Sequence, residues 1–74
     1  MRIKQYRKNK GLTQAQLGEK LGVAQSTVAT WEMGEIAPRT KTLIKIAEVL
    51  QCTVDELLQK EPGEEGNNES SKNY

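Results

Sequence analysis

Apolar residues recur at helical spacing along most of this chain. The clearest run is Leu43, Ile46, Ala47 and Leu50. Side chains at positions i, i+3, i+4 and i+7 lie on one face of an α-helix, whereas a half-buried strand would alternate apolar and polar residues. The pattern predicts an all-α domain.

Capping residues and glycines divide the domain into five predicted helices. Thr13 and Thr53 each stand three residues before a Gln or Glu, the spacing of a capping box, in which side chain and backbone bond reciprocally at a helix start. Gly11, Gly22 and Gly34 come where the first three helices should end, because glycine readily takes the left-handed conformation. The predicted helices cover about residues 2–10, 13–21, 25–33, 41–50 and 54–58.

The chain has room for one small domain and a tail, since it holds 74 residues. We assign the domain to residues 1–60, with a net charge of +4 from ten basic and six acidic residues. Residues 61–74 are polar, carry a net charge of −3 and lack a periodic apolar face, so they are expected to form a short disordered acidic tail. The basic excess of the domain is compatible with a polyanionic partner and equally with an ordinary solvated surface.

Composition argues against most catalytic and metal-binding functions. The chain has no His and a single Cys, Cys52, so it cannot supply an imidazole base, a Cys–His pair or a four-ligand zinc site. We therefore expect no enzyme and no cofactor. One Cys gives no internal disulfide, no apolar stretch approaches the ~20 residues of a membrane span, and no signal peptide opens the sequence. These features predict a soluble, cytoplasmic protein.

The most informative segment covers residues 13–33, where two predicted helices are joined by three or four residues centred on Gly22. So short a turn makes the helices cross steeply, and Gly18 provides a small residue where the later helix should pass close. The wedge between the helices is expected to contain Leu17, Leu21, Val23, Val28 and Trp31. The outward face of the later helix carries Gln25, Ser26, Thr27 and Thr30. Short polar side chains of this kind can read base edges in a DNA major groove.

The sequence resembles the phage Cro and repressor-like (Xre-type) helix-turn-helix DNA-binding family. The likeness extends from about residue 3 to 58 and rests on Gly11-Leu12-Thr13-Gln14, Leu17-Gly18, Leu21-Gly22-Val23, Gln25-Ser26-Thr27-Val28, Trp31-Glu32-Met33-Gly34, Pro38 with residues 42–47, and Asp55-Glu56-Leu57-Leu58. It implies a compact five-helix, lambda-repressor-like domain with a helix-turn-helix at about residues 13–33. The implied function is sequence-specific binding of double-stranded DNA by a transcriptional regulator, with repression the expected outcome.

The resemblance also implies roles for individual side chains. Gln14 is expected to touch phosphate and to brace Gln25, the leading base reader, whose amide can bond N6 and N7 of adenine. The remaining residues assigned to the DNA interface are Thr13, Ser26, Thr27, Thr30, Arg39 and Lys41. Arg7 and Glu32 match a family pair that forms a partly buried ion bridge, which we interpret as structural.

The chain departs from the family pattern at several positions. Ala24 stands where the family often has a Ser or Thr N-cap, which would leave the start of the recognition helix without side-chain capping. Met33 and Glu35 stand where Asn, Lys or Arg is common near phosphates. Before the fourth helix, Arg39 replaces a frequent capping Ser, and Thr40 is expected to cap instead.

One recognition helix with a few short readers covers too few base pairs for discrimination across a genome. We therefore expect a homodimer on a palindromic operator. The sequence leaves two alternatives open: an antitoxin or autoregulator whose tail folds on a partner protein, and a protein-interaction module that uses the same helices. A protein-docking face should offer apolar anchors, and Gln25, Ser26 and Thr30 offer none.

Overall fold

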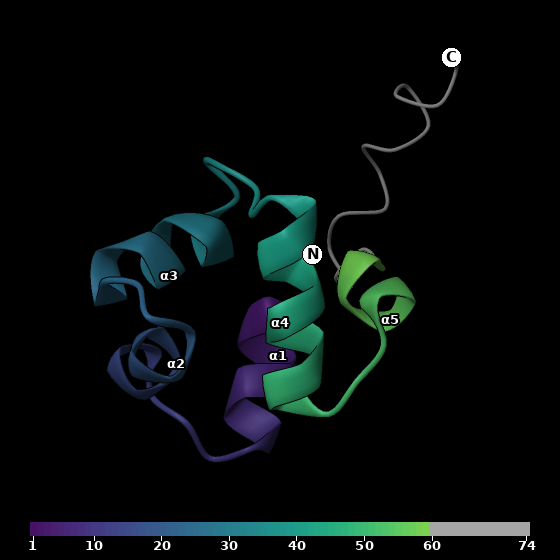
Figure 1. The fold of residues 1–74 in the computed structure, drawn as a ribbon, viewed down its shortest axis with the longest axis horizontal. Coiled ribbons are helices and arrows are strands. Elements are labelled where there is room, and N and C mark those ends of the chain that lie inside the picture. Colours follow the sequence, from purple (N-terminus) through teal and green to yellow (C-terminus); the bar gives the residue numbers. More distant parts are fainter. Residues whose placement is uncertain (60–74) are drawn as a thin grey trace.

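Five α-helices surround one core in the computed structural model, which describes residues 1–59. They are α1 (Ile3–Asn9), α2 (Gln14–Leu21), α3 (Gln25–Met33), α4 (Thr40–Leu50) and α5 (Val54–Leu58), and the rest of this region contains no strand. In Figure 1, α4 lies in front of α1, with α2 and α3 on one side and α5 on the other. The predicted all-α, five-helix fold is confirmed, and each bound lies within one residue of the prediction. The tail predicted for residues 61–74 lies outside the described residues.

Each helix contributes one almost completely buried side chain to the core. These residues, none more than 1% exposed, are Ile3, Leu17, Val28, Ile46 and Leu57. Trp31 joins the same cluster, so it packs as a core residue and offers no ring face for stacking on bases. Cys52 and Tyr6 are only partly buried against this core. Burial of these aliphatic side chains is the main favourable term that holds five short helices together.

The connection between α2 and α3 depends on two glycines. Gly22 ends α2 with a φ of 77°, the left-handed conformation expected for so tight a turn. A Cβ on Gly18 would lie 2.7 Å from the carbonyl oxygen of Val23, so any larger residue would push the turn away. The prediction of a close approach at Gly18 is right, but the element that approaches is the backbone of the turn at Val23 and Ala24, and not α3 itself.

The start and the end of α4 differ from the sequence-based expectation. Arg39 holds the N-cap position in an extended conformation, without a side-chain hydrogen bond to the helix, and Thr40 is already helical. The prediction that Thr40 caps α4 is therefore wrong, because an N-cap residue must lie just outside the helix. At the other end, Gln51 takes the left-handed conformation with a φ of 57°, which the sequence did not reveal because the position is not glycine. None of the five helices is long and apolar enough to cross a membrane.

Candidate nucleic-acid interface

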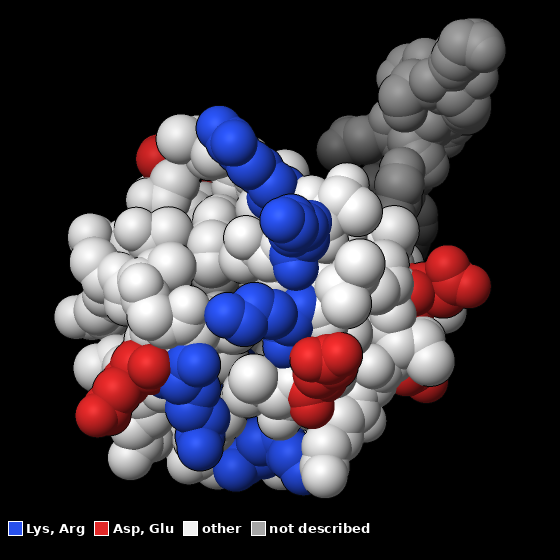
Figure 2. Space-filling view, viewed as in Figure 1, with Lys and Arg blue, Asp and Glu red and all other residues white. Residues whose placement is uncertain are grey.

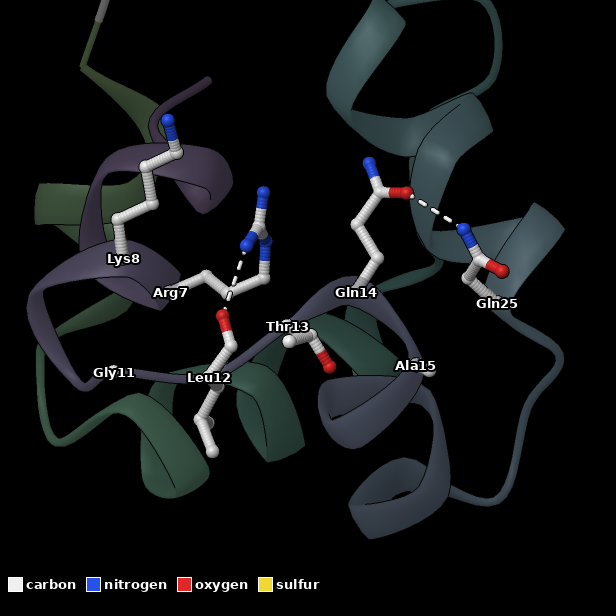
Figure 3. A pocket seen from close by; sticks show the side chains of 8 residues that line it. All are labelled: Arg7, Lys8, Gly11, Leu12, Thr13, Gln14, Ala15 and Gln25. Atoms are coloured by element: carbon white, nitrogen blue, oxygen red, sulfur yellow. Dashed lines mark hydrogen bonds between the residues drawn. The ribbon is translucent and has the colours of Figure 1, made fainter.

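The first turns of α2 and α3 meet the end of α1 around an open hollow, shown in Figure 3. Its lining residues are Arg7, Lys8, Gly11, Leu12, Thr13, Gln14, Ala15 and Gln25. The side chains of Gln14 and Gln25 point toward each other across it. The hollow thus brings together three of the residues predicted to contact DNA, Thr13, Gln14 and Gln25.

Thr13 fixes the start of α2 at the edge of this hollow. The N–H of Gln16 donates to Thr13 Oγ1 at 3.0 Å, and the N–H of Thr13 donates to Gln16 Oε1 at 2.8 Å. This is the capping box predicted from the sequence. Because Gln14 is the first residue of α2, the box also determines where the Gln14 side chain begins.

A buried ion pair joins Arg7, one of the residues that line the hollow, to Glu32. Arg7 Nε donates to Glu32 Oε2 at 2.6 Å, and a second guanidinium nitrogen donates to Glu32 Oε1 at 3.0 Å. The Arg7 and Glu32 side chains are only 8% and 4% exposed. Arg7 also donates to the carbonyl oxygen of Leu12 at 2.9 Å, which holds the loop between α1 and α2. The two residues matched to the family ion pair are therefore in bidentate contact, the geometry that best offsets the cost of burying charge.

The pair keeps both groups ionised. Burial raises the pKa of Glu32, but hydrogen bonds from Arg7 and Gln14 and the positive charges of Arg7 and Lys4 outweigh it, so the pKa lies below the ordinary value of 4.5. The hydrogen bond to Glu32 raises the pKa of Arg7, and burial opposes that change without reversing it. The carboxylate of Glu32 is thus a pure hydrogen-bond acceptor at neutral pH.

Gln14 connects this pair to the start of α3. Its amide nitrogen donates to Glu32 Oε1 at 3.0 Å, and its amide oxygen accepts from Gln25 Nε2 at 3.0 Å. The resemblance implied the contact between the two glutamines. It did not reveal the bond between Gln14 and Glu32, which are 18 residues apart in sequence and meet only because α2 and α3 cross.

The other predicted readers follow Gln25 along α3. Gln25 and Ser26 are exposed, while Thr27 and Thr30 are half-buried. The hydroxyl of Thr30 donates to the carbonyl oxygen of Ser26 at 2.8 Å. Its hydrogen is therefore used within the helix, and only its oxygen lone pairs remain to accept a hydrogen bond from a ligand.

The start of α3 is less well capped than the start of α2, whereas both helices end at a glycine in the left-handed conformation, Gly22 and Gly34. Ala24 occupies the N-cap position and makes no side-chain bond to the helix, as its sequence predicted. Met33, the last residue of α3, is 66% exposed, and Glu35, just beyond the helix, is exposed as well. An apolar side chain at the end of α3 and an acidic one just beyond it thus occupy positions where basic or amide side chains would attract phosphate.

Basic side chains form a band across the face that carries α4, seen in blue in Figure 2. Arg39 and Lys41 lie at the start of α4 and are exposed, and Lys45 is exposed one turn later. Lys10 bonds Gln51 just past the end of α4. Arg39 and Lys41 are not among the residues that line the hollow, so these two predicted phosphate contacts lie outside it.

Comparison with known proteins gives a consistent result. A family model described as helix-turn-helix matches residues 3–57. The HTH-type transcriptional regulator SinR of Bacillus subtilis is 43% identical over 58 residues, which are 77% of this chain and 52% of SinR. Repressor protein C2 of Salmonella phage P22 is 36% identical over 58 residues, 78% of this chain and 27% of that protein.

A crystal structure of SinR in complex with DNA superposes with a TM-score of 0.72 at 42% identity, covering 78% of this chain and 94% of that one. The uncharacterised HTH-type transcriptional regulator YqaE of Bacillus subtilis is 39% identical over 62 residues, 84% of this chain and 53% of YqaE. The chain therefore spans about half the length of SinR and YqaE.

Proposed function

Because this chain belongs to the Cro/C1-type helix-turn-helix family of transcriptional regulators, we propose that it binds double-stranded DNA sequence-specifically with α3 in the major groove and represses transcription. The observation that carries the proposal is the exposed amide of Gln25, held by Gln14 at the start of α3. The proposal also places this protein in the cytoplasm and gives it no cofactor and no catalytic activity. Within residues 1–59, no group of three His, Cys, Asp or Glu side chains could hold a metal ion.

Gln25 is suited to read adenine. Its bond to Gln14 uses one of the two amide hydrogens. The second hydrogen and the carbonyl oxygen can pair with N7 and N6 of an adenine, the arrangement that distinguishes this base in the major groove. Ser26, Thr27 and Thr30 would add shorter and less selective contacts along the same helix.

Phosphate contacts would orient the domain on the duplex. Thr13 and Gln14 at the start of α2, and Arg39 and Lys41 at the start of α4, are the proposed positions. Contacts of Lys and Arg with phosphates release condensed counterions and therefore make the affinity for DNA depend on salt. The uncharged readers on α3 release none and add no such dependence.

The proposed assembly is a homodimer on a palindromic operator. A single α3 of nine residues reaches only a few base pairs, so two copies are needed for a site that is rare in a genome. The two half-sites would lie about one helical turn, ~34 Å, apart.

The decisive experiment compares two variants on two kinds of DNA. Sites are first selected with the wild-type chain from a random duplex pool, and affinities are then measured for the selected operator and for an unrelated duplex. Gln25→Ala should lose ~1–3 kcal/mol on the operator and almost nothing on the unrelated duplex, because no charge is removed. Lys41→Ala should weaken both complexes together and reduce the slope of log affinity against log salt by about one unit.

Two outcomes would contradict the proposal. If no palindrome or other motif is enriched from the pool, the chain does not read sequence. If Gln25→Ala weakens both duplexes equally, or neither, α3 is not the reader, and the protein-interaction module or the partner-bound antitoxin becomes the better explanation.

A further inference from the structure

A continuous chain of hydrogen bonds runs from the buried ion pair to the readout side chain. Arg7 donates to Glu32 at 2.6 and 3.0 Å, Gln14 donates to Glu32 at 3.0 Å, and Gln25 donates to Gln14 at 3.0 Å. Figure 3 shows the last of these bonds at the rim of the hollow. In this chain of bonds, Gln14 is therefore the one side chain that links Glu32 to Gln25.

This chain of bonds has a fixed direction. A guanidinium only donates hydrogen bonds, and an ionised carboxylate only accepts them. Glu32 therefore requires the NH₂ end of Gln14, and the carbonyl end of Gln14 must turn toward α3. That carbonyl in turn requires the NH₂ end of Gln25. A glutamine amide without such a partner could turn by 180°, which exchanges its donor and its acceptor.

We propose that Glu32 is a positioning residue for base readout: acting through Gln14, it sets which end of the Gln25 amide faces Gln14 and which edge faces the DNA. The inference rests on the proposed function and adds to it a residue that touches no base. Adenine offers its acceptor N7 and its donor N6 in a fixed order along the groove. An amide locked in one orientation can match that order in one pose only, so the carboxylate sharpens the choice of base.

The experiment measures base discrimination, defined as the ratio of affinities for the selected operator and for the same operator with the Gln25-dependent base pair replaced. The Gln25-dependent base pair is identified as the one whose replacement no longer lowers the affinity of the Gln25→Ala variant. Glu32→Gln should reduce the ratio roughly fivefold to tenfold, because a neutral amide at position 32 accepts either orientation of Gln14. Gln14→Met, which leaves the ion pair in place, should reduce the ratio by a similar factor.

The double variant separates positioning from a general structural effect. If Glu32 acts through Gln14, Glu32→Gln should change the ratio little when Gln14 is already Met, so the two losses should not multiply. A merely structural role would instead lower the affinity for both duplexes and leave their ratio unchanged. Glu48→Gln, which removes an exposed negative charge from α4, serves as the matched control and should keep the wild-type ratio.

Folding is checked by circular dichroism at the temperature of the binding measurement. If Glu32→Gln is not folded there, Gln14→Met still tests the link, because it leaves both charges of the ion pair in place. A wild-type ratio in folded Glu32→Gln, or in Gln14→Met, would overturn the inference, as would losses that multiply in the double variant. Failure of the proposed function is a different result, because either the wild-type chain then selects no motif from the pool, or Gln25→Ala leaves the base preference of the chain unchanged and no Gln25-dependent base pair exists.

Discussion

The two helices of the helix-turn-helix are similar in length, with eight residues in α2 and nine in α3, but their first turns are held in different ways. Thr13 and Gln16 stabilise the start of α2 through bonds within a single turn. At the start of α3, Ala24 provides no side-chain cap, and the side-chain bond at its first residue, Gln25, goes to Gln14 on the other helix.

The difference shows which helix depends on its neighbours. A capping box is local, so the first turn of α2 is stabilised by side chains of that same turn. The first residue of α3 is instead positioned by tertiary contacts that lead back to the Arg7–Glu32 pair. Under the proposed function, this arrangement leaves the first turn of α3 without a side-chain cap that would compete with a ligand, and the orientation of the Gln25 amide is expected to depend on the buried charges.

The largest expected effect follows from breaking the tertiary support of α3. Arg7→Met leaves the carboxylate of Glu32 buried without its partner, and should lower the free energy of unfolding by ~3–5 kcal/mol. Thermal or urea unfolding measures the loss. Lys8→Met, at an exposed neighbouring position, is the control and should change stability by less than about 0.5 kcal/mol. Equal losses in the two variants would show that the ion pair does not support the fold.

Part of this structure could be predicted from the sequence. The capping boxes at Thr13 and Thr53 and the turn at Gly22 were predictable because each depends on residues a few positions apart. The contact between Arg7 and Glu32 was implied only by resemblance, since no local pattern joins residues 25 positions apart.

Other features depend on the three-dimensional path of the chain. The bond between Gln14 and Glu32 exists because two helices cross at one angle. Gln51 takes the left-handed conformation at the end of α4, and the residue type gives no sign of it. The hydrogen bond from the Thr30 hydroxyl to the carbonyl oxygen of Ser26 depends on a side-chain rotamer. The sequence could therefore indicate Thr30 as a reader, but not that its hydroxyl can only accept a hydrogen bond from a ligand.

A second, smaller effect should appear in acid. The pKa of Glu32 is lower in the folded protein than its ordinary value of 4.5, so the folded state binds this proton less readily than the unfolded chain. The stabilisation that ionised Glu32 gives the folded state is fully present above the pKa of Glu32 in the unfolded chain. It is lost as the pH falls through the lower pKa that Glu32 has in the folded protein. Unfolding measured from pH 6 downward should therefore show a decline below about pH 4.5 that is reduced in Glu32→Gln. An identical decline in both proteins would assign the acid sensitivity to other carboxyl groups.

The smallest effect tests the difference in capping itself. Thr13→Ala should cost ~1 kcal/mol, because the N–H of Gln16 loses its side-chain acceptor. Ala24→Ser should gain about 0.5–1 kcal/mol, since the position is exposed, lies at the N-cap and already has an extended backbone, with φ −71° and ψ 154°. Amide hydrogen exchange resolves the two helices: protection should fall in the first turn of α2 in Thr13→Ala and rise in the first turn of α3 in Ala24→Ser. If Ala24→Ser leaves exchange in α3 unchanged, the contact of Gln25 with Gln14 already holds that turn as firmly as a cap would, and the two helix starts differ in chemistry but not in stability.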